Sequence, residues 1–462
     1  MLAGVGSGRA TLRFLGGTGT VTGSKYLLTF RGKRILIDCG LFQGYKQLRL
    51  RNWGAFPVKP ASLDAVVLTH AHIDHSGYLP ALARDGFKGP IYCSAATRDL
   101  CAILLPDSGH LQEEDARYAN KRGFSKHKPA LPLYTEQDAR RCLPLLRSVN
   151  MGEAVDLGVG LTFELIPAGH ILGSAMAMVR GPAGSILFSG DLGRPNDLMM
   201  RPPTRVAHAD YLVIESTYGD RLHAPDDSGE ALEQIVRRTA ARGGIVLVPE
   251  FAVVRPQTLL YLIHLLKASR RIPNLPVFLN SPMATDVTRL YHEHQDEHRL
   301  NLQQCEDMCR AARFVNTVEE SKGLNDLKMP SIIIAASGMA TGGRVLHHLK
   351  AFAPDRRNTI LFSGFQGSGT RGAGMLAGAS TIKIHGQEVP VEAEVDMLDT
   401  LSAHADWREI MVWLEGFDTQ PRKTFITHGE PASADGLRRR ITDARGWQCD
   451  VPDYLEQREI DI

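Results

Sequence analysis

The chain has 462 residues, of which 43% are hydrophobic and 23% charged, and its formal net charge at pH 7 is +2. This length exceeds one ordinary core and predicts two or three domains, and the composition excludes a disordered or fibrous protein. The small net charge excludes binding of nucleic acid by overall charge alone, so such a partner must be held locally.

The seven cysteines are scattered and no pair shows CxxC spacing, which indicates reduced thiols in a reducing compartment. The N-terminal segment MLAGVGSGRATLRFLGG lacks a basic region followed by a sustained apolar run. No apolar stretch approaches the ~20 residues of a membrane-spanning helix. We therefore expect a soluble protein with a cytoplasmic location.

Short strands that end in glycine-containing turns dominate the first 200 residues. They are TLRFLGG, KYLLTF, KRILIDCG, DAVVLTH and PIYCS, followed by LTFELIPAGH and SILFSGD. From about residue 206, strands alternate with amphipathic helices, beginning with YLVIEST and GEALEQIVRRTAARGG. This alternation predicts a second domain with a mostly parallel sheet flanked by helices, and VEAEVDML and KTFITHG return to the pattern of the first half.

The stretch HAHIDH, residues 70 to 75, places four potential metal ligands directly behind the apolar run AVVL. His70 and His72 alternate by two, so both can project from a strand end toward one point, and Asp74 and His75 lie on the next turn. Zinc favours imidazole and carboxylate ligands. The spacing suits two adjacent ions better than one, although HxH alone would also fit an exposed polar loop.

Three further polar residues end apolar strands beside a glycine: His170 in LTFELIPAGH, Asp191 in SILFSGD and His428 in KTFITHG. Glycine lets the backbone approach a ligand closely. Each residue alone is typical of an ordinary loop. Three such endings in a chain that also carries HxHxDH favour a shared metal site.

Together with Asp38 in LIDCG, these motifs resemble the successive motifs of the metallo-β-lactamase superfamily. The resemblance implies an α/β fold, an αββα sandwich with two Zn²⁺ per chain at one edge, and Mn²⁺ as an alternative metal. The ligands that it implies are His70, His72 and His170 for one zinc, Asp74, His75 and His428 for the other, and Asp191 between them. It also implies that Asp38 supports the ligands without binding metal.

The segments IESTYGDRLH, LSAHADW and ITHGE resemble three further motifs of the β-CASP branch, whose members cut nucleic acids. Supporting similarities are GTVTGS, PEFAVVRPQ, NSPMA, ASGMATGGRVLHHL and FSGFQGSGTRG. The resemblance covers essentially the whole chain and is greatest to the 73 kDa subunit of the cleavage and polyadenylation specificity factor and its prokaryotic relatives. It implies a metallo-β-lactamase domain at 1–205 and 396–462, interrupted by a β-CASP domain at 206–395.

The resemblance further implies a zinc-dependent endoribonuclease that hydrolyses phosphodiester bonds of single-stranded RNA through a hydroxide held between the metals. His404 would protonate the leaving oxygen, Glu215 would hold His404, and Asp74 completes the catalytic set. His428, a histidine at the third motif, marks the RNA-directed members. A 5′-to-3′ exoribonuclease on the same dinuclear site and a non-catalytic RNA-binding subunit stay as alternatives, and a homodimer stays open.

Several residues are candidate contacts for RNA phosphates. Glycine-rich ASGMATGGR follows the strand SIIIA and precedes a helix, whose first N–H groups favour phosphate. The candidates are Arg255, Ser337, Gly338, Arg344, Ser363 and Lys383. A purely structural role stays open for each, and the basic runs YKQLRLR and ARYANKRGFSKHK fit either an RNA path or a solvated surface.

Overall fold

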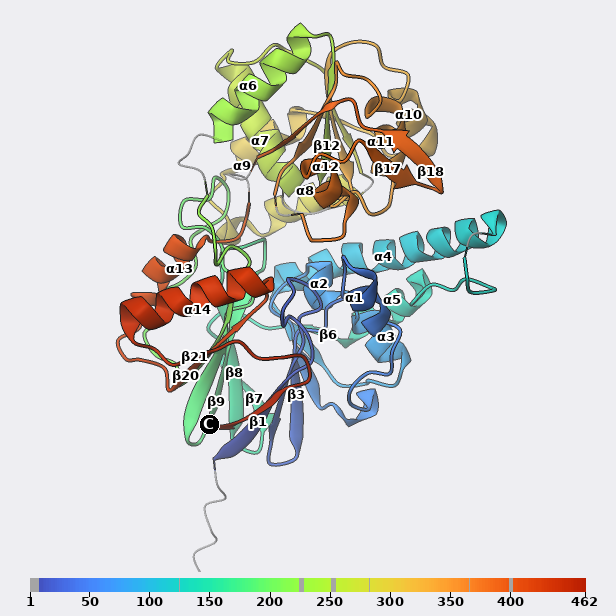
Figure 1. Cartoon of the computed structure of the whole chain (residues 1–462). Helices are drawn as coiled ribbons and strands as arrows, with labels where there is room; N and C mark the ends of the chain where they lie inside the picture. The colour runs from blue at the N-terminus through green and yellow to red at the C-terminus, as the bar shows by residue number, and fades with distance from the viewer. Residues whose placement is uncertain are drawn as a thin grey trace, which may run out of the picture.

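The computed structural model describes residues 8–123, 125–223, 228–250, 255–281, 283–364, 366–398 and 402–462. Three large sheets organise this part of the chain (Figure 1). Parts of several segments quoted above lie outside the described residues, namely MLAGVGSGRATLRFLGG, ARYANKRGFSKHK, PEFAVVRPQ, NSPMA, FSGFQGSGTRG and LSAHADW.

The first two sheets have seven strands each and pack face to face. The first contains, in spatial order, β22 (Gln457–Asp461), β1 (Arg9–Phe14), β2 (Tyr26–Phe30), β3 (Lys33–Ile37), β4 (Ala65–Val67), β5 (Ile91–Cys93) and β6 (Leu146–Ser148). The second contains β21 (Cys449–Asp450), β20 (Lys423–Thr427), β11 (Tyr211–Glu215), β10 (Gly184–Phe188), β9 (Ala175–Gly181), β8 (Leu161–Pro167) and β7 (Val155–Gly158). Their inner faces share one core, in which Phe14 and Phe188 are buried.

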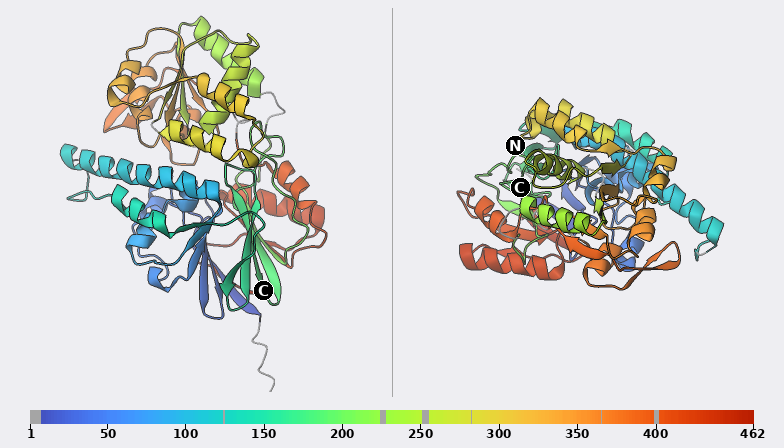
Figure 2. Two further views of the ribbon diagram at one scale, coloured as in Figure 1. Left: turned by 180° about the vertical axis from the view of Figure 1, so that it is seen from behind. Right: turned by 90° about the horizontal axis from the view of Figure 1, so that it is seen from above.

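Helices cover the outer face of both sheets (Figures 1 and 2). On the first sheet these are α2 (Ile73–Ser76), α3 (Leu79–Arg84), α4 (Ala95–Arg122) and α5 (Glu136–Cys142), and on the second α13 (Trp407–Leu414) and α14 (Pro431–Arg445). Leu82 and Leu100 pack into a core with Leu36, and Leu437 shares another with Leu212. The predicted αββα sandwich is confirmed.

The long helix α4 begins and ends at recognisable local signals. The Ser94 hydroxyl accepts a hydrogen bond from the Thr97 N–H at 3.1 Å, which caps the first turn. At the other end Gly123 adopts a left-handed φ of 68°, which stops the helix at low steric cost. A 28-residue helix therefore spans one side of the sandwich.

The third sheet forms the inserted unit, and every pair of neighbouring strands in it is parallel. Its order is β14 (Arg313–Phe314), β13 (Val277–Asn280), β15 (Ser331–Ala336), β12 (Ile245–Glu250), β16 (Thr359–Phe362) and β19 (Glu394–Met397). The flanking elements are α6 (Ser228–Ala241), α7 (Arg255–Ala268), α8 (Met283–Glu293), α9 (Leu302–Arg310), α10 (Val318–Leu324), α11 (Val345–Phe352), α12 (Arg371–Leu376) and the hairpin of β17 (Thr381–Ile384) with β18 (Gln387–Pro390). The predicted mostly parallel sheet between helices is confirmed.

Two strands belong to a different sheet than the sequence pattern indicates. YLVIEST, expected to open the inserted unit, forms β11 in the second sheet, between β10 and β20. VEAEVDML, expected to return to the first unit, forms β19 at the edge of the third sheet. The reason is that β11 is buried throughout and only its last residue, Glu215, is charged, so its composition fits a central strand of either sheet. The domain limits at 205/206 and 395/396 stay a prediction.

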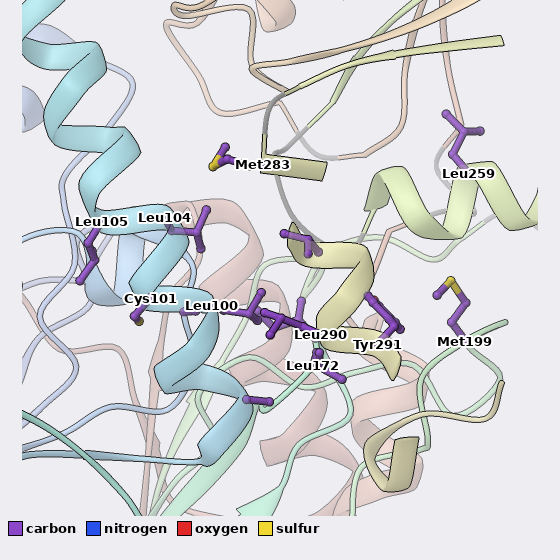
Figure 3. Close-up of a cluster of buried hydrophobic side chains, with 14 of the residues drawn as sticks. Leu100, Cys101, Leu104, Leu105, Leu172, Met199, Leu259, Met283, Leu290 and Tyr291 are labelled. Carbon is purple, nitrogen blue, oxygen red and sulfur yellow. The ribbon is translucent and has the colours of Figure 1, made fainter. Parts of the chain in front are cut away.

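A continuous apolar core joins the sandwich to the inserted unit (Figure 3). Leu100 and Leu104 on α4 lie in one cluster with Leu290 and Tyr291 on α8, and all four are buried. The cluster extends to Leu259 on α7. The two units are therefore held by packed side chains and not by the connecting chain alone.

Leu290→Ala is expected to destabilise the protein by about 2–5 kcal/mol, because a buried leucine at this joint loses its packing and leaves a cavity. Thermal and denaturant unfolding measure the loss. Leu302→Ala, on the exposed start of α9, is the matched control and should unfold like the unsubstituted chain. Equal stability of both variants would contradict a packed joint.

Candidate metal centre

Seven potential ligands, contributed by both sheets of the sandwich, converge at one edge. His70, His72, His170 and Asp191 form one group, and Asp74, His75 and His428 form the other. Within each group the ligand atoms all lie within 4.8 Å of one another. Each ligand follows one of the strands β4, β8, β10 and β20 or lies on α2. The ligands converge because the carboxyl ends of these strands lie at the same edge of the sandwich.

The ligand atoms face one another at short range. His72 Nδ1 lies 3.1 Å from His70 Nε2 and 3.2 Å from His170 Nε2, and the Nε2 atoms of His75 and His428 are 3.0 Å apart. Asp191 lies between the groups, with Oδ2 3.4 Å from His70 Nε2 and Oδ1 3.2 Å from His75 Nε2.

This donor set fits zinc. The Asp191 Oδ1 atom is buried and accepts no hydrogen bond from the described residues, although a buried carboxylate oxygen ordinarily has a partner. Five imidazoles and two carboxylates turned toward common points are ligands that Zn²⁺ prefers. The residues would accommodate one ion in each group, with Asp191 shared.

Burial and charge set the protonation of these side chains. Burial lowers the pKa of His72 and of His170, so both imidazoles stay neutral, which is the form that binds metal. For His75 burial acts in the same direction, but the carboxylates of Asp191 and Asp38 outweigh it and raise the pKa. The two carboxylates thus favour a proton on His75, whereas metal binding requires the neutral imidazole.

Asp38 lies behind the ligands. Its Oδ1 accepts from the Thr69 N–H at 2.8 Å, and its Oδ2 accepts from the Thr69 hydroxyl at 2.9 Å and from His75 Nδ1 at 2.8 Å. A proton held on Nδ1 leaves Nε2 of His75 as the ligand atom, turned toward His428. The supporting role that the resemblance implies for Asp38 stays a prediction.

Asp38→Asn is expected to weaken zinc binding by about 10- to 100-fold, since the amide no longer attracts the Nδ1 proton of His75 as a carboxylate does. Competition with a chromogenic chelator measures the affinity. Asp64→Asn removes the same charge from a surface pair with Lys33 and serves as the control. Unchanged zinc affinity in Asp38→Asn would contradict the supporting role.

Glu215 and His404 form a pair beside the ligands. His404 Nδ1 lies 3.1 Å and 3.2 Å from the two carboxylate oxygens of Glu215. Glu215 is 1% exposed and also accepts from the Leu192 N–H and the Thr217 hydroxyl, each at 2.6 Å. Nε2 of His404 makes no hydrogen bond with the described residues, so this nitrogen is available to a substrate.

His223 is a residue of this site that the sequence interpretation did not single out. Its Nε2 donates a hydrogen bond of 2.9 Å to the backbone carbonyl of His404, and its backbone N–H donates to Asp406 at 3.0 Å. His223 therefore fixes the backbone that carries His404. The available signal was its place at the end of IESTYGDRLH, the same motif that supplies Glu215.

A cavity of about 1120 Å³ opens between the sandwich and the inserted unit. The ligands and catalytic candidates on its wall are His72, Asp74, Asp191, His404 and His428, and the phosphate candidates are Arg255, Ser337, Gly338 and Lys383. Residues from both units thus enclose one space that contains the metal centre.

Two phosphate candidates do not line this cavity. The Arg344 guanidinium donates to Asn280 Oδ1 and to the Asn316 carbonyl, both at 2.9 Å. The Ser363 hydroxyl donates to Glu250 and is buried. Both side chains hold the inserted unit together, and their sequence neighbours gave no indication of the direction in which they point.

Comparison with known proteins places the chain in a family. The model of the metallo-beta-lactamase superfamily matches residues 18–234, the Beta-Casp domain matches 256–375, and a Zn-dependent metallo-hydrolase RNA specificity domain matches 388–452. Ribonuclease TTHA0252 of Thermus thermophilus is 38% identical over 418 residues, which cover 89% of this chain and 91% of that protein. The chain belongs to the β-CASP branch of the metallo-β-lactamase superfamily.

Other similarities agree with this assignment. Transcription termination factor FttA of Methanocaldococcus jannaschii is 31% identical over 447 residues, which cover 92% of this chain and 68% of the factor. The crystal structure of a protein of unknown function from Enterococcus faecalis covers 98% of this β-CASP chain and 100% of its own, with a TM-score of 0.52 and 15% identity, and shares the fold.

The predicted class of this β-CASP protein, a zinc-dependent metallo-hydrolase directed at RNA, is confirmed by the RNA specificity model together with the buried ligand groups. Among the described helices, none has both the length and the apolar character required to cross a membrane. A cytoplasmic location and a homodimer stay predictions.

Proposed function

We propose that this chain is an endoribonuclease that uses two Zn²⁺ ions to hydrolyse phosphodiester bonds of single-stranded RNA. The observation that carries the proposal is the Glu215–His404 pair, which lies beside the seven-ligand centre and on the same cavity. The metal centre alone serves many hydrolyses, whereas a phosphodiester also requires a proton for its leaving oxygen. The name of the Thermus relative, a ribonuclease, supports the same reading.

Two zinc ions bound here supply an activated water and neutralise charge on the phosphoryl oxygens. The ligands would hold the ions at a buried edge, with Asp191 between the two groups. His404 Nε2 faces the substrate and transfers its proton to the leaving oxygen, while Glu215 accepts from Nδ1–H and keeps the ring oriented. Arg255 and Lys383, which the inserted unit contributes to the cavity wall, would hold phosphates.

Single-stranded RNA is the preferred substrate in this proposal because the metal centre lies inside a cavity enclosed by two units. A single strand can turn its backbone toward the ligands, whereas the phosphates of a duplex stay on a stiff cylinder. The two units are also joined by a packed core, which opposes wide opening for a duplex.

A covalently closed RNA circle without base pairing tests the mode of cleavage. An endonuclease converts the circle to a linear product of the same length before shorter fragments form. An enzyme that degrades the matching linear RNA but leaves the circle intact is a 5′-to-3′ exoribonuclease on the same site. A protein that binds the linear RNA and cuts neither substrate, with Zn²⁺ or Mn²⁺ restored, is the non-catalytic subunit.

A further inference from the structure

Trp53 is a feature of the cavity that the catalytic proposal does not use. Its side chain is 57% exposed, yet it lines the same cavity as His72 and His404. Trp413 and Trp447 are buried, and Trp407 lies under the Arg440 guanidinium, 4.4 Å from the ring centroid. Among the described residues, no ring or cation contacts Trp53. An indole face is therefore presented to the cavity.

The backbone at Trp53 is held in place by its neighbour. Asn52 is buried, and its side chain bonds both backbone groups of Phe42, accepting from the N–H at 2.9 Å and donating to the carbonyl at 2.8 Å. The Trp53 N–H donates to the Leu50 carbonyl at 3.1 Å. The exposed ring thus stands on a fixed backbone, and binding to it requires little ordering of the protein.

Positive charge lies close to Trp53 along the chain. Lys46 and Arg49, on the preceding helix α1 (Lys46–Arg51), line the cavity, and their side chains make no hydrogen bond or ion pair with the described residues. The α4 wall of the cavity carries Asp107 and Asp115 instead. Phosphates are attracted to the α1 side and repelled from the α4 side.

We propose that Trp53 is a base-stacking subsite, on which one unpaired nucleotide of the RNA strand lies while Lys46 and Arg49 hold the flanking phosphates. This inference rests on the proposed function, since it places the substrate of the same cavity. An aromatic face beside cations is the combination by which proteins hold single strands without reading their sequence. A paired base keeps its faces inside the helix, so the subsite also selects unpaired RNA.

Binding of fluorescently labelled single-stranded RNA tests the proposal in the His404→Ala background with zinc present, where cleavage during the measurement is strongly slowed. Trp53→Ala should raise the Kd by about 5- to 150-fold, as loss of one stacked base does. Trp53→Phe should keep most of the affinity because it keeps an aromatic face. Leu302→Ala, an equally exposed apolar side chain outside the cavity, should leave the Kd unchanged.

A series of RNAs with one abasic site at successive positions then locates the stacked base. An abasic site at one position should weaken binding to the protein that carries Trp53. The same abasic site should not weaken binding to Trp53→Ala any further, because the substitution has already removed the stacking contact. Equal Kd values for Trp53→Ala and its parent, or abasic losses that persist in full in Trp53→Ala, would overturn the subsite. Those results leave the proposed function intact if the chain with the native His404 and Trp53 still binds and cuts RNA, whereas failure of that chain both to bind and to cut RNA overturns both proposals.

Discussion

Replacing Asp74 by alanine is expected to abolish cleavage of RNA and to lower the zinc content from two ions per chain toward one. Asp74 Oδ2 lies 3.4 Å from His428 Nε2, in the group that also contains His75. Without the carboxylate, two imidazoles and the shared Asp191 face this ion, and one negative charge that offsets the metal is lost. Metal analysis of the purified protein and an assay on a labelled single strand measure both effects.

The control for this variant is Asp85→Ala, which removes an exposed carboxylate paired with Arg84. It should keep both zinc ions and full activity. Asp74→Ala with two tightly bound zinc ions and ordinary cleavage would show that Asp74 is not a ligand. Loss of cleavage with both ions retained would assign Asp74 to the substrate and not to the metal.

Replacing His404 by alanine is expected to lower kcat by about 10²- to 10⁴-fold while both zinc ions and RNA affinity are retained. The imidazole bonds to Glu215 and its side chain lines the cavity, so its loss removes a proton donor and none of the predicted ligands. Glu215→Gln should reduce kcat in the same direction, because a neutral amide orients and stabilises the ring less well. His208→Ala, an exposed histidine bonded to Thr419, is the control.

The proton-donor role has a sharper test in the substrate. Sulfur in place of the leaving bridging oxygen gives a leaving group that departs as a thiolate without a proton. His404→Ala should then cut the sulfur-containing RNA nearly as fast as the unsubstituted enzyme does. An equal defect on the oxygen and sulfur substrates would indicate that His404 positions the strand and does not donate the proton.

The candidate ligands could be predicted from the sequence because their signals are local. HAHIDH lies on one strand end and the following turn, and His170, Asp191 and His428 each follow an apolar strand beside glycine. The strand-end argument requires only that neighbouring strands terminate at the same edge. The pairing of ligands into two groups came from the resemblance, and the structure brings the same groups together.

Side-chain direction and strand neighbours were not predictable in this way. Arg344 and Ser363 lie in glycine-rich segments typical of phosphate binding, but their side chains point to Asn280 and Glu250. The composition of the buried strand at Tyr211–Glu215 fits either unit. Its place in the second sheet follows from pairing with Gly184–Phe188 and with Lys423–Thr427, and the latter lies far along the chain. Trp53 was not singled out from the sequence, because a local sequence pattern does not show that an exposed side chain lines a cavity.

The pairing of β11 with β20 also has a consequence for biosynthesis. Thr217 and His428 contact each other although 211 residues separate them, and the whole inserted unit is encoded between them. At a synthesis rate of about 5–20 residues per second, the strand that completes the second sheet emerges roughly 10–40 s after β11. His428, the last of the candidate ligands in chain order, is therefore synthesised after the other residues that line the cavity. The nascent chain lacks a complete set of candidate ligands until that point.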